Sequence, residues 1–481
     1  MKSDGKDTSA HPSRRTMLKS GAGMIGSLMP GIGLSALGAG PVRAADKPSS
    51  LNMLYATSEA NSDAIKAVLP DYKAATGIEI KLDTMPYNAL QQKVFAELAS
   101  GSPYYDIMIV DTPWMPALTH KIEPITDLVL DPAMSGDLDI ADFIPKVFFD
   151  TAVYKKDASN LHFERTDTVD PAAIKLGGFD IFGLPMQANV LTLAYRKDLF
   201  EDAANKEAYK KKAAKDLAAP ATWDDFSEIA SFFTDPGKRL WGSTLMAGAG
   251  DWATDDFKTL LAGFGDDGHL VNDKFEPAFA SPEGVKALTF YADLINVKKV
   301  TPPGTTSASW DEVATAFSNG LTAMTMNYHD LALAPNVKGA VEYAVVPKGV
   351  SIGPHFGTWM LSVNSFSKNK EWAYRTIQWF TSAATQTKAL QHQLHPTRAS
   401  VYETAIKDSG LSQKFANFYE ILGKSLAVGV GRPRLTNYGD VDRAIWVAVN
   451  NAARGAATPE AALKEATSQV NELLIQAGYK K

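Results

Sequence analysis

Residues 51–87, LNMLYATSEANSDAIKAVLPDYKAATGIEIKLDTMPY, change their apolar period twice. The mostly apolar run 51–56 is typical of a strand, and residues 78–82 alternate between apolar and polar, as in a second strand. Between them, apolar residues recur at helical spacing at positions 65, 68, 69 and 72. A strand, a helix and a second strand in this order form a βαβ unit, which predicts a parallel sheet with helices on its faces.

The same alternation of elements continues along the chain. Leu90, Val94 and Leu98 predict a helix, and the apolar run DIMIVD at 106–111 predicts the next buried strand. Later helices have recognisable starts: a capping box in TWDD (222–225), and a proline at the first helical position after Ser281 and after Thr458. We therefore predict an α/β fold in which helices dominate the later half.

The composition excludes several classes of protein. The 481 residues carry a formal net charge of −6 and contain no cysteine. An acidic chain is a poor partner for nucleic acid or for an anionic membrane surface. Without cysteine, disulfides, thiolate metal sites and iron–sulfur clusters are excluded. The apolar fraction of 45% is that of a globular protein, and the length suffices for two or three domains. We expect a monomer without a nucleic-acid partner.

Residues 1–44 have the features of an export signal. The paired arginines of SRRTMLK (13–19) are followed by a stretch without charge that ends at Arg43, and VRA (42–44) supplies a small-residue cleavage site. Glycines and Pro30 interrupt the apolar run, which favours a cleaved signal over a membrane anchor. We expect a twin-arginine signal peptide at 1–44, a mature start near Ala45 and a periplasmic location. Because there is no cysteine, we expect no lipid anchor.

Two glycine motifs do not indicate nucleotide binding. GAGMIG (21–26) matches the dinucleotide fingerprint, but a basic segment precedes it where a strand is needed, and Pro30 follows where a helix is needed. GKS (423–425) fails because Phe418 stands where a phosphate loop has its first glycine. The sequence therefore predicts no cofactor.

Several strings in the rest of the chain are shared with one known family. They are GLPMQANVLTLAYRKDLF (183–200), PATWDDFSEIA (220–230), FSNGLTAMTMNYHD (317–330), GTWMLSVNSFSKNKEWAYRTIQWFTSAATQ (357–386), PTRASVY (396–402) and AARGAATPEAALKEA (452–466). Taken in order, they resemble the family 1 extracellular solute-binding proteins of carbohydrate ABC transporters. The set spans most of the chain that follows the signal.

This resemblance implies a fold and a function. The fold is a two-lobed, type II-like periplasmic binding protein fold, in which hinge segments join two α/β lobes and the ligand lies in the cleft between them. Carried onto this sequence, residues 46–190 and 324–380 form the N-lobe, and residues 191–323 and 381–481 form the C-lobe. The function is to bind a sugar, oligosaccharide or polyol and to deliver it to the permease subunits of an ABC importer.

A cleft binds such ligands with paired polar groups and flat aromatic platforms, because sugars present hydroxyls at their rims and C–H groups on their faces. Asp111 and Trp114 come at the carboxyl end of the strand 106–111, where ligands gather in open α/β sheets. The other candidates are Asp251 and Trp252 in a glycine-rich loop, Trp310 before a helix, and Trp359 in GTW. The alternative for each tryptophan is a place in a core, since tryptophan is highly buried on average.

Further polar residues lie at strand ends or in loops that the family aims at the cleft. These candidates are Glu59, Gln187, Asn189, Asn327, His329 and Arg398, and Tyr87 in MPYN joins them. Residues of these types also serve as caps and turn residues, so both roles stay open.

An exported enzyme and a metal-binding protein are the main alternatives outside this family. A polysaccharide-active enzyme needs two carboxylates that flank a glycosidic bond, whereas the paired aspartates at 224–225, 255–256 and 266–267 are only adjacent in sequence. A metal site could use His392 and His395, but no third ligand is evident. We expect neither catalysis nor a metal.

A third alternative keeps the fold and changes the ligand. A polyamine or another non-sugar would need acidic groups between aromatic walls, which Asp111 and Asp251 could supply. Arg398 and the number of tryptophans favour a neutral polyol or oligosaccharide.

Overall fold

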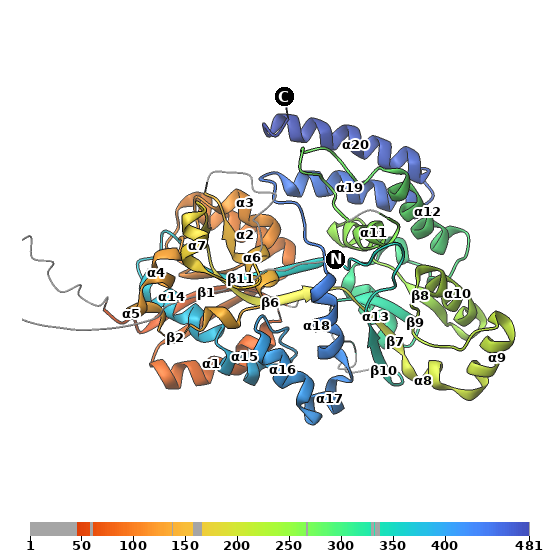
Figure 1. The fold of residues 1–481 in the computed structure, drawn as a ribbon, viewed down its shortest axis with the longest axis horizontal. Coiled ribbons are helices and arrows are strands. Elements are labelled where there is room, and N and C mark those ends of the chain that lie inside the picture. The colour runs from red at the N-terminus through yellow and green to blue at the C-terminus, as the bar shows by residue number, and fades with distance from the viewer. Residues whose placement is uncertain are drawn as a thin grey trace, which may run out of the picture. The chain divides into compact units, whose positions relative to one another are not determined.

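The computed structural model describes residues 46–57, 61–136, 138–156, 166–265, 268–328, 331 and 337–480. Two sheets, each with its own apolar core, organise these residues (Figure 1). The first sheet has the strand order β2 (Glu79–Met85), β1 (Ser50–Ala56), β3 (Ile107–Asp111), β11 (Phe356–Val363) and β6 (Leu184–Val190). The second has the order β10 (Val341–Ala344), β7 (Thr192–Arg196), β9 (Thr322–Asn327) and β8 (Trp241–Thr244).

The βαβ unit predicted from residues 51–87 is confirmed. Strands β1 and β2 pair in parallel, and helix α1 (Ser62–Thr76) connects them. The helix ends at Gly77, whose φ of 71° lies in the left-handed region that glycine adopts without strain. Helix α2 (Tyr87–Ser100) then leads to β3, which is fully buried and pairs in parallel with the other side of β1. This order places the carboxyl end of β3 in the middle of the sheet.

The second sheet collects strands that are distant in sequence. Strand β7 pairs antiparallel with both β9 and β10, and β8 pairs in parallel with β9. The chain therefore enters this sheet after β6 and leaves it after β10. In Figure 1 the strands β1, β2, β11 and β6 lie on one side, and β7 to β10 lie on the other. We refer to the two sheets with their covering helices as the first and the second lobe.

The remaining elements cover these sheets. Around the first lobe lie α3 (Met115–Leu118), α4 (Thr126–Leu130), α5 (Pro132–Ser135), α6 (Pro145–Ala152), α7 (Pro171–Leu176), α14 (Lys370–Phe380) and the small hairpin of β4 (Val153–Tyr154) and β5 (Asp180–Ile181). The second lobe has α8 (Lys197–Glu201), α9 (Ala203–Ala213), α10 (Trp223–Phe233), α11 (Asp251–Gly263), α12 (Pro282–Asn296), α13 (Trp310–Ser318), α19 (Tyr438–Ala453) and α20 (Pro459–Gln476). The predicted helix starts are confirmed, since Thr222 makes a capping box and Ser281 and Thr458 are N-caps.

A third apolar cluster joins the two sheets. It contains residues of α16 (Ala399–Lys407), α17 (Ser409–Phe415) and α18 (Phe418–Val428), together with buried side chains of β6 and of β7. Helix α15 (Ala383–Ala389) precedes this group and packs on α1. Because α18 contacts strands of both sheets, the segment that follows it starts at the junction between the lobes.

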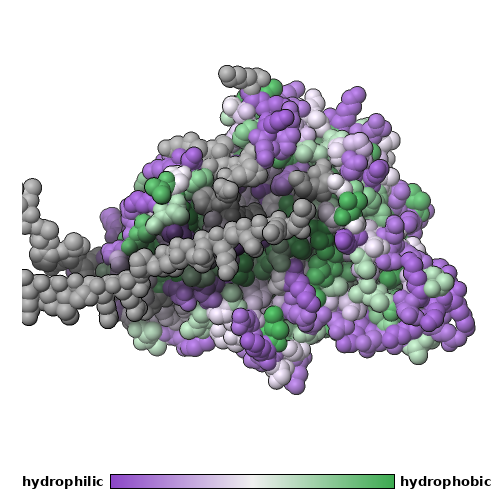
Figure 2. Space-filling model, viewed as in Figure 1, coloured by the Kyte–Doolittle hydropathy of each residue, from purple (hydrophilic) through white to green (hydrophobic). Residues whose placement is uncertain are grey.

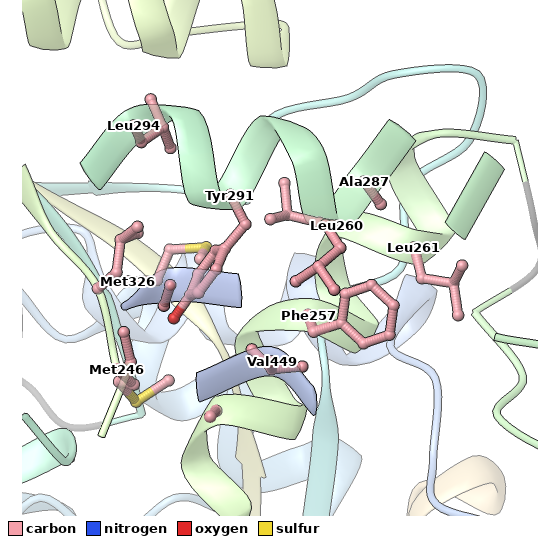
Figure 3. Close-up of a cluster of buried hydrophobic side chains, with 14 of the residues drawn as sticks. Met246, Phe257, Leu260, Leu261, Ala287, Tyr291, Leu294, Met326 and Val449 are labelled. Carbon is pink, nitrogen blue, oxygen red and sulfur yellow. The ribbon is translucent and has the colours of Figure 1, made fainter. Parts of the chain in front are cut away.

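The core of the second lobe fixes the helix that carries two residues of the site described below. Phe257, Leu260 and Leu261 of α11 pack toward Tyr291 of α12 and Val449 of α19 (Figure 3). All five side chains are almost completely inaccessible to solvent. Burying a large apolar side chain contributes about 1.5–3 kcal/mol. This packing holds α11 in place and fixes the position of its first turn.

Much of the surface that Figure 2 shows is hydrophilic. Hydrophilic residues dominate the face in Figure 2 over α9 and α20, and Lys210, Lys211 and Lys212 of α9 are all exposed. Among the described helices, none is both long enough and apolar enough to span a membrane.

Candidate ligand-binding cleft

A cavity lies where elements of the two lobes meet. It has an empty volume of about 400 Å³. Its walls come from α2, β3, β6 and β11 of the first lobe, from α11, α13 and the end of β9 in the second, and from the segment between α18 and α19. The lining residues are Tyr87, Asp111, Asn189, Asp251, Asp255, Trp310, Tyr328, Gly357, Trp359 and Arg432. A molecule in this cavity would contact both lobes.

Aromatic rings from both lobes meet around Tyr87. Its ring centroid lies 5.3 Å from that of Trp114, 5.8 Å from that of Trp359 and 6.0 Å from that of Trp310. Tyr87 meets Trp310 and Trp359 edge to face, at 83° and 89°. Trp252 in turn packs edge to face on Trp310 with 5.1 Å between centroids. Such contacts stabilise each ring by about 0.5–1.5 kcal/mol beyond its burial, so the aromatic wall is held in place before a ligand arrives.

Arg432 joins a carboxylate of one lobe to a carboxylate of the other. Its Nη1 lies 3.1 Å from Oδ2 of Asp111 at the end of β3, and its Nη2 lies 3.7 Å from Oδ1 of Asp255 on α11. The hydroxyl of Tyr87 donates to the same Asp111 oxygen at 2.9 Å, and the hydroxyl of Tyr328 donates to Asp255 at 2.8 Å. The arginine and both carboxylates are buried, so solvent screens these interactions little.

Burial makes the carboxylates of the cleft weaker acids. It raises the pKa of Asp111 and of Asp255, while the charge of Arg432 offsets part of the rise in both. The pKa of Asp251 is raised well above its usual range by burial and then by the charges of Asp255 and Asp442. Burial alone would lower the pKa of Arg432, but Asp111 and Asp255 hold it well above its ordinary value. Arg432 is therefore a permanent cation, and Asp251 is the carboxyl that ionises least readily.

The first turn of α11 brings two of these acids to one side of a helix. Asp251 and Asp255 are four residues apart, which places them one above the other. The residue before this turn has to be glycine: a Cβ at Gly250 would lie 2.3 Å from the ring of Trp252, far too close for any side chain. The indole ring thus folds back over the backbone at the start of α11, and this contact orients both Trp252 and the turn.

Most of the residues predicted from the sequence come together here. Six of them line the cavity: Tyr87, Asp111, Asn189, Asp251, Trp310 and Trp359. Trp114 and Trp252 line a neighbouring groove, which shares Tyr87, Asp251 and Arg432 with the cavity. Glu59 and His329 lie outside the residues that the structure describes.

Two of the predicted residues lie behind the wall of the cavity. Gln187 is fully buried in β6, and its Nε2 donates to Oδ1 of Asn189 at 3.1 Å. Asn327 ends β9, where its Nδ2 donates to the carbonyl oxygen of Trp310 at 3.0 Å and its Oδ1 accepts from the backbone N–H of Tyr328 at 2.8 Å. Both amides thus orient side chains that do line the cavity.

Arg398 lies away from the cavity. Its side chain is 1% exposed and donates to three backbone carbonyl oxygens, those of Thr381 at 2.5 Å and of Leu138 and Asp139 at 2.8 Å. Its guanidinium also lies 3.9 Å from the ring centroid of Phe143. All of these partners belong to the first lobe, and Arg398 directly precedes α16, so it fastens the start of that helix to the lobe.

Four lining residues were not among the predicted contacts: Asp255, Tyr328, Gly357 and Arg432. The spacing of Asp255 from Asp251 on one helix is a signal in the sequence that could have identified it. Gly357 leaves room for Arg432, since a Cβ there would already lie 3.6 Å from Nη1 of the arginine. Arg432 itself stands in a segment without regular structure, and no local pattern marks it as a site residue.

The cleft is not arranged as a metal centre. Among the described residues, no group of three or more histidine, aspartate or glutamate side chains has the geometry to hold a metal ion. His395 is buried, and its Nδ1 is hydrogen-bonded to Asn189 at 2.8 Å.

A cleft walled by both lobes, with aromatic rings and buried polar groups, defines a two-lobed binding protein for small solutes. The chain belongs to the family of bacterial extracellular solute-binding proteins, whose sequence model matches residues 56–387. The resemblance inferred from the sequence, the two-lobed α/β fold and the solute-binding function are thereby confirmed.

Similar proteins cover nearly the whole chain. A probable amino-acid ABC transporter periplasmic-binding protein of Sinorhizobium fredii is 24% identical over 433 residues, which are 89% of this chain and 90% of that protein. An ABC transporter solute-binding protein of Agrobacterium radiobacter K84, solved in complex with ribitol, is 26% identical with a TM-score of 0.72 and covers 89% of this chain and 100% of its own. The maltose-bound MalE3 of T. maritima is 25% identical, with a TM-score of 0.71, and covers 88% and 100%.

Proposed function

We propose that this protein is the periplasmic substrate-binding component of an ABC importer and that it takes a small sugar or polyol into the cavity between its lobes. The observation that carries this proposal is the lining itself. Buried carboxylates and an amide, Asp111, Asp255 and Asn189, stand opposite the rings of Trp310 and Trp359. Ligand hydroxyls can donate to the carboxylate oxygens while C–H faces lie on the rings.

The charges of the cleft argue against an amino acid as ligand. Arg432 is the only cation among the described residues that line the cavity, and Asp111 and Asp255 already occupy it. The carboxylate of an amino acid would find no free cation there and would meet Asp251 as well. A buried charge without a partner is costly, so a ligand without a carboxylate fits better. Ribitol, bound by the similar protein of Agrobacterium radiobacter, is such a molecule.

The size of the cavity favours a small ligand. Its empty volume of about 400 Å³ includes the open solvent at its mouth, so the enclosed space is smaller still. The rings of Tyr87, Trp310 and Trp359 close one side of it. A polyol or a monosaccharide therefore fits this chamber better than an oligosaccharide.

The division into lobes suggests how ligand binding is signalled to a permease. Strand pairing favours a first lobe that contains β1–β6 and β11 and a second lobe that contains β7–β10, with a boundary between β10 and β11. Only a conformation with the lobes together offers the ligand both Asp111 and Trp310, so the ligand shifts the population toward it. The permease subunits would read that conformation, and no bond of the ligand is made or broken. We further propose export by the twin-arginine signal at 1–44 and action as a monomer without a lipid anchor.

A thermal-unfolding screen tests this function. The purified protein is heated with ribitol, mannitol, glucose, maltose and each of several amino acids in turn. A ligand that binds only the folded state at about 100 times its Kd adds about 2.7 kcal/mol of stability, which raises the melting temperature by several degrees. We expect a rise with a polyol or a monosaccharide. A rise with amino acids alone, or steady chemical turnover of a sugar, would show that the proposal is wrong.

A further inference from the structure

Asp251 is a lining residue whose charge the protein does not balance. The guanidinium of Arg432 is held by Asp111 and Asp255. The carboxylate of Asp251, by contrast, makes no hydrogen bond or ion pair with any residue that the structure describes. It reaches the cavity from the first turn of α11, so a ligand can approach it directly.

The surroundings of Asp251 add negative charge. Asp255 lies one turn further along α11, and Asp442 on α19 is a second carboxylate whose charge reaches Asp251. Burial raises the pKa of Asp442 to about 7, and burial followed by the charges of Asp255 and Asp442 raises the pKa of Asp251 well above its usual range. The charges of Arg432 and of Asp111 also reach Asp251, where the first lowers its pKa and the second raises it. This side of the cavity therefore has a deficit of positive charge.

Aromatic rings stand close to the same carboxylate. Trp252, the next residue along α11, packs on Trp310 with 5.1 Å between ring centroids, and Asp251 lines the same cavity as Tyr87. Trp310 lines the same cavity and meets Tyr87 edge to face. An ammonium group is attracted to a ring face within about 6 Å of the centroid and to a carboxylate at hydrogen-bond distance. The cavity presents both partners on one side.

We propose that the ligand is a polyhydroxylated molecule that carries one ammonium group, such as an amino sugar or an amino-deoxy polyol, and that the ammonium binds between Asp251 and the ring of Trp310. This inference rests on the proposed function, because the hydroxyls of the ligand still bind at Asp111, Asp255 and Asn189. It adds the charge of the ligand, which the fold and the family do not specify.

Two series of compounds with equal skeletons and different charges test the inference. The first series is 1-amino-1-deoxy-D-glucitol, D-glucitol and D-gluconate, and the second is D-glucosamine, D-glucose and D-glucuronate. Titration calorimetry on the intact protein measures each affinity at neutral pH. In at least one series we expect the amine to bind about tenfold more tightly than the neutral compound, which corresponds to about 1.4 kcal/mol, and the acid to bind most weakly.

Substitution of Asp251 identifies the residue responsible. The variant Asp251→Asn keeps the size of the side chain and removes its charge, so the ratio of amine to neutral affinity should fall to about one. Because Asp251 lines the cavity, the affinity for the neutral compound can change as well, so the readout is the ratio of the two affinities and not either affinity alone. Asp440→Asn is the matched control, because Asp440 is exposed and does not line the cavity. It should leave the ratio unchanged.

The outcomes separate this inference from the function on which it rests. If neutral compounds bind and the amines bind no better, the inference is wrong and the proposed function stands. If Asp251→Asn keeps the preference for the amine, the ammonium is bound elsewhere and the assignment to Asp251 is wrong. If no polyhydroxylated compound of either series binds, both the inference and the proposed function fail.

Discussion

Replacement of Arg432 by methionine should destabilise the empty protein in a way that depends on pH. The arginine is 8% exposed, and its partners Asp111 and Asp255 are 3% and 2% exposed. Removing one partner from a buried ion pair typically costs about 3–5 kcal/mol, because it leaves a buried charge without compensation. Here one substitution leaves two such carboxylates. We therefore expect the free energy of unfolding to fall by about 3–5 kcal/mol at pH values above about 7.

The sign of the pH dependence follows from the two carboxylates. Burial already raises the pKa of Asp111 and of Asp255 in the folded protein, and Arg432 offsets part of that rise. In Arg432→Met the folded-state pKa of each rises further, so the folded state binds more protons than the unfolded state over a wider range. Stability then decreases as pH increases from the unfolded pKa of about 3.9 to the folded one, by up to about 1.4 kcal/mol per pH unit for each carboxylate. The deficit of the variant should shrink accordingly as the pH is lowered.

Urea unfolding of the ligand-free protein near pH 8 and near pH 5.5, followed by far-ultraviolet circular dichroism, measures this deficit. Arg432→Lys should recover part of it, since an ammonium keeps the charge but cannot form the fork that reaches two carboxylates. Arg454→Met is the control, because Arg454 is exposed and lies outside the cleft. A deficit of equal size at both pH values would mean that packing and not charge explains the loss, and a deficit below about 1 kcal/mol would contradict the ion-pair argument altogether.

Other substitutions separate ligand contacts from structural ones. Trp310→Ala should weaken binding of the ligand found in the thermal screen by at least about tenfold, as measured by calorimetry. The reason is that a stacking ring contributes about 0.5–1.5 kcal/mol beyond its buried area. Unchanged affinity would show that Trp310 does not belong to the site. Gly357→Ala should leave the melting temperature unchanged, because its Cβ would meet neighbours only at 3.5 Å or beyond. Calorimetry should nevertheless show weaker ligand binding, because the methyl group projects beside Arg432. A folding defect would contradict the prediction of an unchanged melting temperature. Arg398→Met should lower the free energy of unfolding by about 3 kcal/mol or more through lost buried hydrogen bonds, and calorimetry should find ligand affinity retained. Asp251→Asn should raise the melting temperature of the empty protein at alkaline pH, where the carboxyl of Asp251 must ionise against its raised pKa. A lower value there would show that Asp251 has a stabilising partner.

The fold could be predicted from the sequence where local patterns decide it. The apolar periods of residues 51–87 define β1, α1 and β2, and Gly77 ends the helix in a conformation that glycine favours. The assignment of strands to sheets depends on distant pairing instead. Strand β9 is a short, fully buried apolar run, and nothing within it specifies that β7 and β8 are its neighbours. Burial was therefore predictable from the sequence, and the choice of sheet was not.

The residues of the site likewise divide into those that the sequence predicts and those that depend on distant packing. Asp111 was predictable because it lies at the end of a strand, where sheets of this class gather ligands, and Trp359 because it stands in the GTW string shared with the family. Arg398 and Arg432 both stand in irregular segments between two helices, and neither belongs to an apolar pattern that would give its direction. Arg398 points into the first lobe and Arg432 points into the cavity, because the neighbouring helices α16 and α18 pack on different partners. Only the tertiary packing distinguishes them.

A count of charges links the missed arginine to the proposed ligand. Three carboxylates, Asp111, Asp251 and Asp255, reach one small cavity, and a folded protein cannot hold all three ionised there without a cation. Arg432 satisfies two of them by reaching across both lobes. The third carboxylate, that of Asp251, remains uncompensated, and this lowers the stability of the empty protein. A cationic group of the ligand can supply the missing positive charge. The same imbalance thus weakens the empty protein and strengthens its preference for an amine.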